Sequence, residues 1–285
     1  MTPEPYFFHS EVAAKILKAA DQGLSTIKIS LDLNLSQKNF KIKNTCLVLD
    51  DISAIEIRRL EPVASSPGKI FMFMDNELKP LEIRSGGYYK LVPTKTAPIL
   101  EINGIKMHRS GSIDPLFDAR LKAELVVRPC DTVLDTCAGL GYSAVHALKQ
   151  GAEKIISAEK SREVIRLGRY NPWFKEYRKE KTQLIHGDIT LLITKMKKET
   201  FNSVIHDPPR FTSASGMLYS RKFYDELFRV MAKGARLFHY TGSPGRIRHQ
   251  DRFIKNTIKR LEASGFENLE FRENLQGIHA KKNKA

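Results

Sequence analysis

The residues best suited to chemistry in this chain follow short apolar segments and carry acidic or glycine side chains. The segment VLDTCAGLGYSA places Asp135 ahead of Gly139 and Gly141, and a helix is predicted to begin near Ser143. Glycines let the backbone turn tightly and approach a ligand closely. The first turn of a helix offers free N–H groups. The spacing therefore predicts a ligand-binding loop between a strand and a helix.

Two kinds of ligand fit such a loop. Gly139-x-Gly141-x-x-Ala144 matches the dinucleotide fingerprint, and Glu159 follows at the distance expected for an NAD site. Asp135, however, would repel a pyrophosphate, whereas it can accept a hydrogen bond from the ammonium group of a methionine moiety. This carboxylate favours S-adenosylmethionine over NAD.

Two later segments extend the predicted cofactor site. Glu159 closes the segment ISAEK and can accept from both hydroxyls of a ribose, while Asp188, directly after Gly187, can accept from an adenine amino group. Either acid alone could equally be a helix N-cap or a solvated carboxylate. Because the acids follow successive predicted strands in order, we interpret them as one site.

The segment VIHDPPRFT follows the fourth of these strands. Its prolines, Pro208 and Pro209, fix two consecutive φ angles and remove two donors. This holds the Asp207 carboxylate and the Pro208 carbonyl as a pair of acceptors, which suits an exocyclic amino group. Such acceptors can free the delocalised nitrogen lone pair of cytosine or adenine and stabilise the positive charge that develops on methylation. The segment predicts N-methyl transfer to a nucleobase.

Aromatic residues near this segment are candidates for holding the base. A base in folded RNA must be splayed out to reach such a site, and stacking on an aromatic ring stabilises it there. Phe211 directly follows the motif, and Tyr219, Phe223 and Tyr224 are close in sequence. We predict Phe211 as the stacking platform, with core packing as the alternative for all four.

The order of these segments resembles class I S-adenosylmethionine-dependent methyltransferases, and Asp-Pro-Pro resembles amino-methyltransferases acting on adenine N6 or cytosine N4. The stretches DTCAGLGYSA, HDPPRF and LFHYTGSPG are similar to a family of archaeal methyltransferases. The resemblance covers about residues 110–285. It implies modification of cytidine N4 in small-subunit ribosomal RNA, with transfer RNA as a second candidate.

Motifs and resemblance together define the predicted site. The predicted cofactor-binding residues are Asp135, Cys137, Gly139, Gly141, Tyr142, Glu159, Lys160, Gly187, Asp188 and Asp207. The predicted catalytic residues are Asp207, Pro208, Pro209 and Phe211, and the predicted substrate-binding residues are Arg210, Tyr219 and Tyr224.

The sequence departs from the amino-methyltransferase pattern at one position. Arg210 stands directly after the second proline, where these enzymes carry an aromatic residue. Its guanidinium could stack on the base or contact a phosphate.

The DPPR form also resembles uridine C5 methyltransferases, which need a cysteine nucleophile. No cysteine lies beyond Cys137, whose small size alone explains its place in the glycine loop, so nitrogen is favoured over carbon as the acceptor.

The elements that would position these residues alternate between strand and helix. Such alternation predicts a Rossmann-like α/β domain over residues 109–285, with a mostly parallel sheet and helices on both faces. The expected strands are 132–134, 155–158, 183–186, 203–206 and 235–240, and the expected helices are 114–126, 143–149, 162–170, 189–196, 221–231 and 252–264. Residues 281–285 are expected to form a short basic tail.

Residues 1–108 show a different pattern. Helical spacing over 8–22 is followed by period-two segments, which predicts a small helix-plus-sheet domain. The expected strands are 27–33, 40–49, 54–60, 70–74, 82–91 and 99–105. No catalytic motif is recognisable here, so we expect a role in substrate docking, with structural support as the alternative.

Composition limits the remaining possibilities. Hydrophobic residues make up 41% of the chain and charged residues 28%, which suits a folded protein. With no apolar run of membrane length and no signal-like start, we expect a soluble cytoplasmic protein without a membrane partner. Cys46, Cys130 and Cys137 form no CxxC pair, and the histidines show no metal-ligand spacing, so no metal is expected. His206 and His239 are expected in the core.

The charge is strongly basic and unevenly distributed. The net charge is +15, and residues 126–285 hold 30 of the 47 lysines and arginines but 17 of the 32 acids. A clustered basic field attracts polyanions, of which nucleic acid is the commonest, so RNA is the expected partner. The clusters are Arg162, Arg166, Arg169, Lys175, Arg178, Lys179 and Lys181, and Arg246, Arg248, Arg252, Lys255, Lys259 and Arg260.

Three functions remain open on the sequence alone. The first is an RNA amino-methyltransferase. The second is a small-molecule transferase that uses the same cofactor, or its decarboxylated form in aminopropyl transfer. The third is a non-catalytic RNA-binding protein, which the intact acids Asp135, Glu159, Asp188 and Asp207 disfavour.

Overall fold

The computed structural model describes residues 4–111, 113–178, 180–242 and 250–283. The chain divides into two compact units. The first comprises residues up to 115 together with 166–175, and the second comprises 116–165 together with residues from 176 onward. Trp173 explains the short insertion in the first unit, because its indole Nε1 donates to the Leu33 carbonyl at 2.8 Å.

The first unit consists of small antiparallel sheets and a helix. One sheet has the order β1-β6-β7 (Tyr6–His9, Ile70–Met74, Glu77–Pro80). A second has the order β2-β3-β4-β5 (Thr26–Ile29, Lys38–Lys43, Cys46–Val48, Ala54–Glu56). The third has the order β11-β10-β9-β8 (Ile105–Lys106, Ile99–Ile102, Tyr88–Val92, Glu82–Arg84).

Helix α1 (Ser10–Asp21) supplies much of this unit's core. Its buried face carries Val12 and Ile16, which pack with Phe8, Leu47 and Ile55. The short helices η1 (Ile57–Leu60) and α2 (Glu61–Ala64) complete the unit. The predicted helix-plus-sheet pattern is present, although several expected strands are shorter or divided at turns.

The second unit is built on one seven-stranded sheet with the order β14-β13-β12-β15-β16-β18-β17. The strands are β12 (Thr132–Asp135), β13 (Lys154–Glu159), β14 (Thr182–His186), β15 (Phe201–His206), β16 (Met231–Tyr240), β17 (Phe266–Arg272) and β18 (Gly277–Lys282). The first five strands in this order are parallel, whereas β18 runs antiparallel to both β16 and β17.

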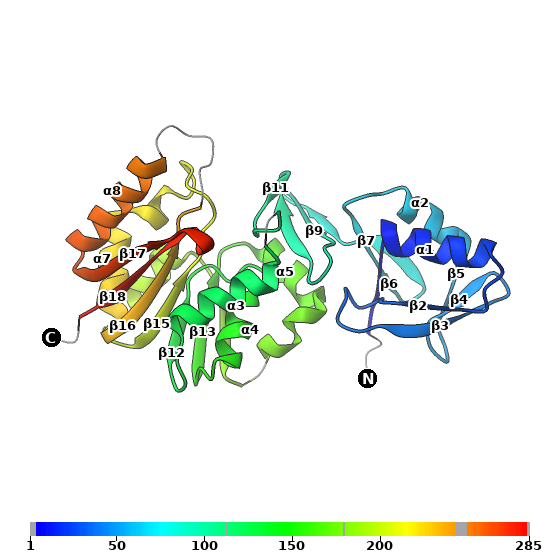
Figure 1. The fold of residues 1–285 in the computed structure, drawn as a ribbon, viewed down its shortest axis with the longest axis horizontal. Helices are drawn as coiled ribbons and strands as arrows, with labels where there is room; N and C mark the ends of the chain where they lie inside the picture. The colour runs from blue at the N-terminus through cyan, green and yellow to red at the C-terminus, as the bar shows by residue number, and fades with distance from the viewer. Residues whose placement is uncertain (1–3, 112, 179, 243–249, 284–285) are drawn as a thin grey trace. The chain divides into compact units, whose positions relative to one another are not determined.

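Helices α4 (Tyr142–Lys149), α7 (Arg221–Val230) and α8 (Gln250–Ala263) pack along this sheet (Figure 1). The other helices after residue 114 are α3 (Pro115–Val126), α5 (Arg162–Tyr170), η2 (Pro172–Arg178), α6 (Ile189–Leu192), η3 (Ile193–Lys195), η4 (Gly216–Tyr219) and η5 (Glu273–Leu275). Of these, α5 from Arg166 onward and η2 up to Lys175 belong to the first unit. Helix α4 contacts β12 and β13, while α7 contacts β16 and α8 contacts β17. The Rossmann-like α/β fold predicted from the sequence is confirmed.

The C-terminal hairpin corrects one expectation. Lys281 and Lys282 belong to β18 and are not part of a basic tail. Lys282 is buried, and its ammonium donates to the carbonyls of Phe228 at 3.0 Å and Met231 at 2.8 Å. Pairing with β16 draws this segment into the sheet, which the charge pattern alone did not indicate.

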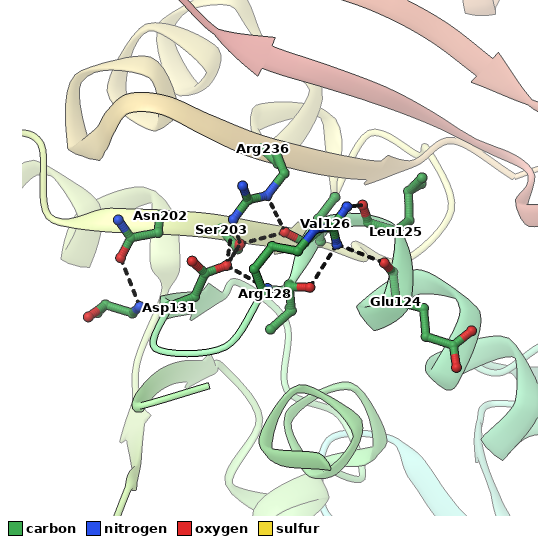
Figure 2. Close-up of polar contacts among 10 residues, drawn as sticks. Glu124, Leu125, Val126, Arg128, Asp131, Asn202, Ser203 and Arg236 are labelled. Carbon is green, nitrogen blue, oxygen red and sulfur yellow. Dashed lines mark hydrogen bonds and ion pairs between the residues drawn. The ribbon is translucent and has the colours of Figure 1, made fainter. Parts of the chain in front are cut away.

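A buried polar network lies where β12 begins (Figure 2). The Arg236 guanidinium pairs with the Asp131 carboxylate at 2.6 Å and donates to the Val126 carbonyl. The Ser203 hydroxyl contacts the same carboxylate, and the Arg128 N–H donates to it at 2.8 Å. This network fixes the connection from α3 into the sheet, at the end opposite the predicted chemistry.

Candidate active site

The parallel register brings the predicted acids to one edge of the sheet. Asp135 pairs with Ser157 of β13 and with Ile205 of β15, so Glu159 and Asp207 both follow within two residues of that level. Carboxyl ends of parallel strands are where ligands bind in open α/β sheets. The acids after β12, β13 and β15 therefore face one region.

Asp135 is fully buried at the end of β12. Its Oδ2 accepts from the Ser157 hydroxyl at 3.2 Å, and the Cys137 N–H also stabilises the carboxylate, but Oδ1 has no hydrogen bond of normal geometry among the described residues. Burial raises the pKa of Asp135 to about 7, and the nearby Asp207 carboxylate adds to the rise. A buried carboxylate oxygen without a partner is costly unless a ligand supplies a donor. An ammonium group would supply it, so Asp135 fits the cofactor predicted from the sequence.

The glycine loop is tied to the second strand. Gly139 and Gly141 have φ angles of 53° and 79°, a region that favours glycine, and Gly141 is the N-cap residue of α4. Glu159 accepts from the Gly139 N–H and from the Ser161 N–H, each at 2.9 Å. Burial raises the pKa of Glu159, and these two donors offset part of the rise. Beside the loop, Tyr142 is buried in the first turn of α4.

Asp188 is the N-cap residue of the short helix α6. Its Oδ1 accepts from the Thr190 N–H at 2.9 Å, and its Oδ2 pairs with the Lys160 ammonium at 2.9 Å. Burial opposes the charge, but Lys160 and Thr190 together lower the pKa of Asp188. The N-cap role, one of the two interpretations of the sequence, is thus present. Because Oδ1 also accepts from the Thr190 hydroxyl at 2.7 Å, the predicted adenine contact would have to use the remaining lone pair of Oδ2.

Asp207 forms a buried ion-pair network that sequence analysis missed. The Lys122 ammonium lies 2.6 Å from Asp207 Oδ2 and 2.7 Å from Asp118 Oδ2. The side chains of Lys122 and Asp118 are each 5% exposed, whereas that of Asp207 is 26% exposed. Burial opposes the Lys122 charge, but the two carboxylates outweigh it and raise the pKa of the ammonium.

A signal for this network does exist in the sequence. Asp118 and Lys122 are four residues apart on α3, on the side that also buries Ala119, Ala123 and Val126. Charged residues on the apolar side of a helix are rarely buried without partners. Such a pair suggests a buried ion pair, but it does not identify Asp207 as the third member.

Polar contacts from buried side chains hold the backbone of the Asp-Pro-Pro segment. The Tyr219 hydroxyl donates to the Pro209 carbonyl at 2.9 Å, and the Ser215 hydroxyl donates to the Arg210 carbonyl at 2.7 Å. Tyr219 is 2% exposed and Tyr224 is 0% exposed. Both tyrosines were predicted as substrate-binding, but Tyr219 lies on the core side of the segment and Tyr224 contacts the buried His239, so neither presents a ring to a base.

Phe211 lies on the outer side. Its side chain is 55% exposed and meets the Tyr219 ring edge-on, with 5.4 Å between ring centroids. Phe253 of α8 packs against it at 5.3 Å. Arg210 is also exposed. Of the four aromatic candidates, Phe211 has the exposure that a stacking platform needs.

The two strand-end histidines are buried, as expected. His206 Nε2 lies 3.0 Å from the Leu218 carbonyl, an acceptor, so this nitrogen carries the proton. The Thr136 hydroxyl then donates to Nδ1 at 2.7 Å. Burial lowers the pKa of His206 to about 4, and it lowers that of His239 as well. Both rings are neutral core residues at physiological pH.

The predicted basic clusters are only partly available to a polyanion. Lys175 pairs with Glu4 and Lys181 with Glu153, while Arg260 is turned toward Thr257. Exposed basic residues remain on α5 and α8, namely Arg162, Arg166 and Arg169, and Arg252, Lys255 and Lys259. Lys179, Arg246 and Arg248 lie outside the described residues, as does the side chain of Arg178.

The described ranges show neither a metal-ligand cluster nor a membrane-spanning helix. No group of three or more histidine, cysteine or acidic side chains in that part of the chain could hold a metal ion. No helix there is both long and apolar enough for a membrane span.

Comparison with known sequences gives one close relative and several distant ones. An uncharacterized protein of Methanocaldococcus jannaschii, MJ1233, is 39% identical over 280 residues, which cover 97% of this chain and 95% of that protein. Ribosomal RNA large subunit methyltransferase I of Vibrio vulnificus is 25% identical over 179 residues. That match covers 57% of this chain but only 45% of the methyltransferase. No protein-family model matches the chain.

Comparison with solved structures identifies the fold. A spermidine synthase in complex with the transition-state analogue AdoDATO aligns with a TM-score of 0.57 at 16% identity, covering 72% of this chain and 73% of that one. Spermidine synthase from Thermotoga maritima aligns with a TM-score of 0.57 at 14% identity, covering 100% and 81%. These alignments and the distant methyltransferase relatives confirm the predicted class I S-adenosylmethionine-dependent methyltransferase fold.

Proposed function

The chain belongs to the same family as the uncharacterized Methanocaldococcus jannaschii protein, and we propose that it methylates an exocyclic amino group of a base in RNA, with cytidine N4 of ribosomal RNA as the first candidate. Asp207 carries the proposal. One of its oxygens is held by the buried Lys122, and the side chain is still 26% exposed beside the Asp135 region. No described residue donates to Oδ1 of Asp207, which leaves this oxygen to accept from an amino N–H.

The site would accelerate methyl transfer chiefly through hydrogen-bond acceptors that are already in position before the substrate binds. S-adenosylmethionine supplies an electrophilic methyl group when bound. Asp207 and the Pro208 carbonyl would each accept one N–H of the substrate amino group and stabilise the positive charge that develops on its nitrogen. Because the Lys122 ion pair and the Tyr219 contact already hold this segment, little reorganisation is needed. The proton lost from nitrogen after transfer can pass to water.

Carbon methylation is disfavoured by the state of Cys137. Burial raises the pKa of the Cys137 thiol well above its usual value, and the nearby Glu159 carboxylate adds to the rise. The thiolate is the nucleophilic form of cysteine. A thiol so placed would rarely be ionised, which supports nitrogen over base carbon as the methyl acceptor.

RNA as the substrate is supported by charge and by the distant relatives. The exposed basic residues of α8 and the net charge of +15 suit a polyanion. The Vibrio vulnificus relative is named as a large-subunit ribosomal RNA methyltransferase. The family resemblance in the sequence instead implies the small subunit. Experiment must therefore decide which ribosomal subunit carries the modified base.

Incorporation of radiolabelled methyl groups tests this function. The full chain is incubated with tritiated S-adenosylmethionine and total RNA, and in parallel with a polyamine precursor and decarboxylated cofactor. We expect label in RNA that is lost with Asp207→Asn, by about 100-fold in kcat. Transfer to the polyamine precursor without transfer to RNA would refute the proposal.

A further inference from the structure

A small polar cavity lies in the first unit, far in sequence from the catalytic motifs. Its volume is about 100 Å³, below the usual size of a small-molecule pocket. Its lining comes from several elements and is mostly charged or polar, including His9, Glu11, Lys15, Lys28 and Lys95. A cavity of this size can take one compact group.

The charge of the lining favours an anion. Lys15 of α1, Lys28 of β2 and Lys95 of the segment between β9 and β10 converge on the cavity, and Glu11 is the acid that lines it. None of the three lysines forms an ion pair within the described ranges. Three lysines against one acid leave the walls with an excess of positive charge, which attracts anions.

The start of helix α1 adds donors at the same place. His9, Glu11 and Val12, which surround its first turn, all line the cavity. His9 is the N-cap residue and makes no side-chain capping bond. The first N–H groups of a helix lack intrahelical partners, and they favour anions. Here that general property coincides with a lysine-lined cavity.

His9 lines the cavity with an uncharged ring. It is 8% exposed, and its Nδ1 has no hydrogen-bond partner among the described residues. Burial lowers its pKa, and Lys15 adds to the effect while Glu11 opposes it. The ring is therefore neutral, so the lysines carry the positive charge of the cavity.

We infer that this cavity is a phosphate-binding site, taking one phosphate oxyanion through Lys15, Lys28, Lys95 and the first turn of α1. The phosphate could come from an RNA backbone or from a free phosphate or nucleotide, since both present the same oxygens. The RNA source rests on the proposed function, whereas phosphate binding itself does not. The site would give the first unit a defined part in substrate docking.

Binding of inorganic phosphate to the full chain is the first test. The imidazole NMR resonances of His9 report on the cavity, and we expect them to shift saturably as phosphate is added at constant ionic strength. The triple variant Lys15→Gln/Lys28→Gln/Lys95→Gln should lose the shift. The charge-matched control Lys18→Gln/Lys41→Gln/Lys43→Gln changes exposed lysines of the same unit outside the cavity and should keep it.

A second arm with a short RNA in place of phosphate identifies the source. If RNA shifts the same resonances, and the cavity triple variant lowers the salt dependence of RNA binding by the equivalent of about one phosphate contact, a backbone phosphate is the ligand. A shift with phosphate alone assigns the site to a free phosphate or nucleotide. Absence of a shift with either probe, or equal behaviour of both triple variants, overturns the inference, whatever the result of the methylation assay.

Discussion

The Lys122–Asp207 pair is the residue-scale feature on which the proposed chemistry depends. A buried lysine shared between two carboxylates restricts the orientation of both. Of the two carboxylates, only Asp207 is partly exposed. Lys122 therefore fixes the orientation of a carboxylate that is accessible at the sheet edge. Lys122 does not itself contact a reacting atom in this account. It is a positioning residue.

Removing Lys122 alone would leave two uncompensated acids and could unfold the protein. The double variant Asp118→Asn/Lys122→Met keeps the net charge of the network unchanged. We expect it to lower kcat for RNA methylation by about 10- to 100-fold, with cofactor affinity within about twofold of the parent. Asp118→Asn alone is the control and should retain most activity. An unchanged kcat in a folded double variant would remove Lys122 from the mechanism.

Asp135 predicts a pH dependence of cofactor binding. Its pKa is raised from 3.8 to about 7, so below that pH the folded protein holds a neutral carboxyl that cannot pair with an ammonium. Affinity for S-adenosylmethionine should therefore rise about tenfold from pH 6 to pH 8 as the carboxylate forms. Calorimetric titration measures this directly. Asp135→Asn should bind weakly with a flat profile, and a flat profile in the parent chain would contradict the assignment.

The raised pKa of Asp135 has the opposite effect on the stability of the folded protein, which decreases as pH rises. The unfolded chain releases the Asp135 proton near pH 3.8, whereas the folded chain keeps it to about pH 7. The contribution of this residue to the free energy of unfolding thus decreases as pH rises between those values. Bound cofactor would reverse this penalty by supplying a cation.

The candidate site residues could be predicted where the motif that identifies them is local in the sequence. Asp135, Gly139, Gly141 and the Asp-Pro-Pro segment are each identified by their neighbours in sequence. Lys122 was not, because its contact with Asp207 joins residues 85 positions apart. Tyr219 was associated with the right segment, but its direction depends on packing around η4, which sequence spacing does not specify.

At the scale of elements, predictions were best for buried parallel strands and the helices between them. These have continuous apolar segments or clear helical spacing, as in α5, whose predicted bounds match those observed. The hairpin β17–β18 was missed. Its strands carry many charged residues and a register shift between Glu267 and Glu270, which obscures the alternation.

The network around Arg236 (Figure 2) predicts a large effect on stability. Arg236→Met leaves the Asp131 carboxylate, 10% exposed, without its cation. Breaking such a pair costs about 3–5 kcal/mol of unfolding free energy, measurable by urea denaturation. Arg272→Met, which breaks an exposed pair with Glu270, is the control and should cost less than about 1 kcal/mol. Equal effects in both variants would show that the Arg236 network adds nothing particular.

At the scale of the whole molecule, the excess positive charge predicts how RNA binds. Each phosphate contact adds about 0.7 (single strand) to 0.9 (duplex) to the magnitude of the slope of log affinity against log salt. We expect Arg252→Gln/Lys255→Gln/Lys259→Gln on α8 to weaken RNA binding and to reduce this slope, while cofactor binding is unchanged. Fluorescence anisotropy at several salt concentrations measures both quantities. RNA affinity that does not vary with salt would contradict the electrostatic account.

The division of the chain was only partly visible in the sequence. A change from period-two segments to strand–helix alternation suggested a boundary near residue 108. The compact units observed divide after residue 115 and assign residues 166–175 to the first unit. The Trp173–Leu33 hydrogen bond joins residues 140 positions apart, and no local pattern reports such a contact. The docking role of the first unit remains a proposal, to which the phosphate site gives a specific form.

The most direct test of the central claim is to locate the transferred methyl group on RNA. RNA from a strain lacking the protein is treated with the chain and S-adenosylmethionine carrying a trideuterated methyl group, and the nucleosides are analysed by mass spectrometry. The account predicts label on an exocyclic nitrogen, first as N4-methylcytidine, and none with Asp207→Asn. Label on a base carbon or on ribose, or its appearance only in small molecules, would contradict it.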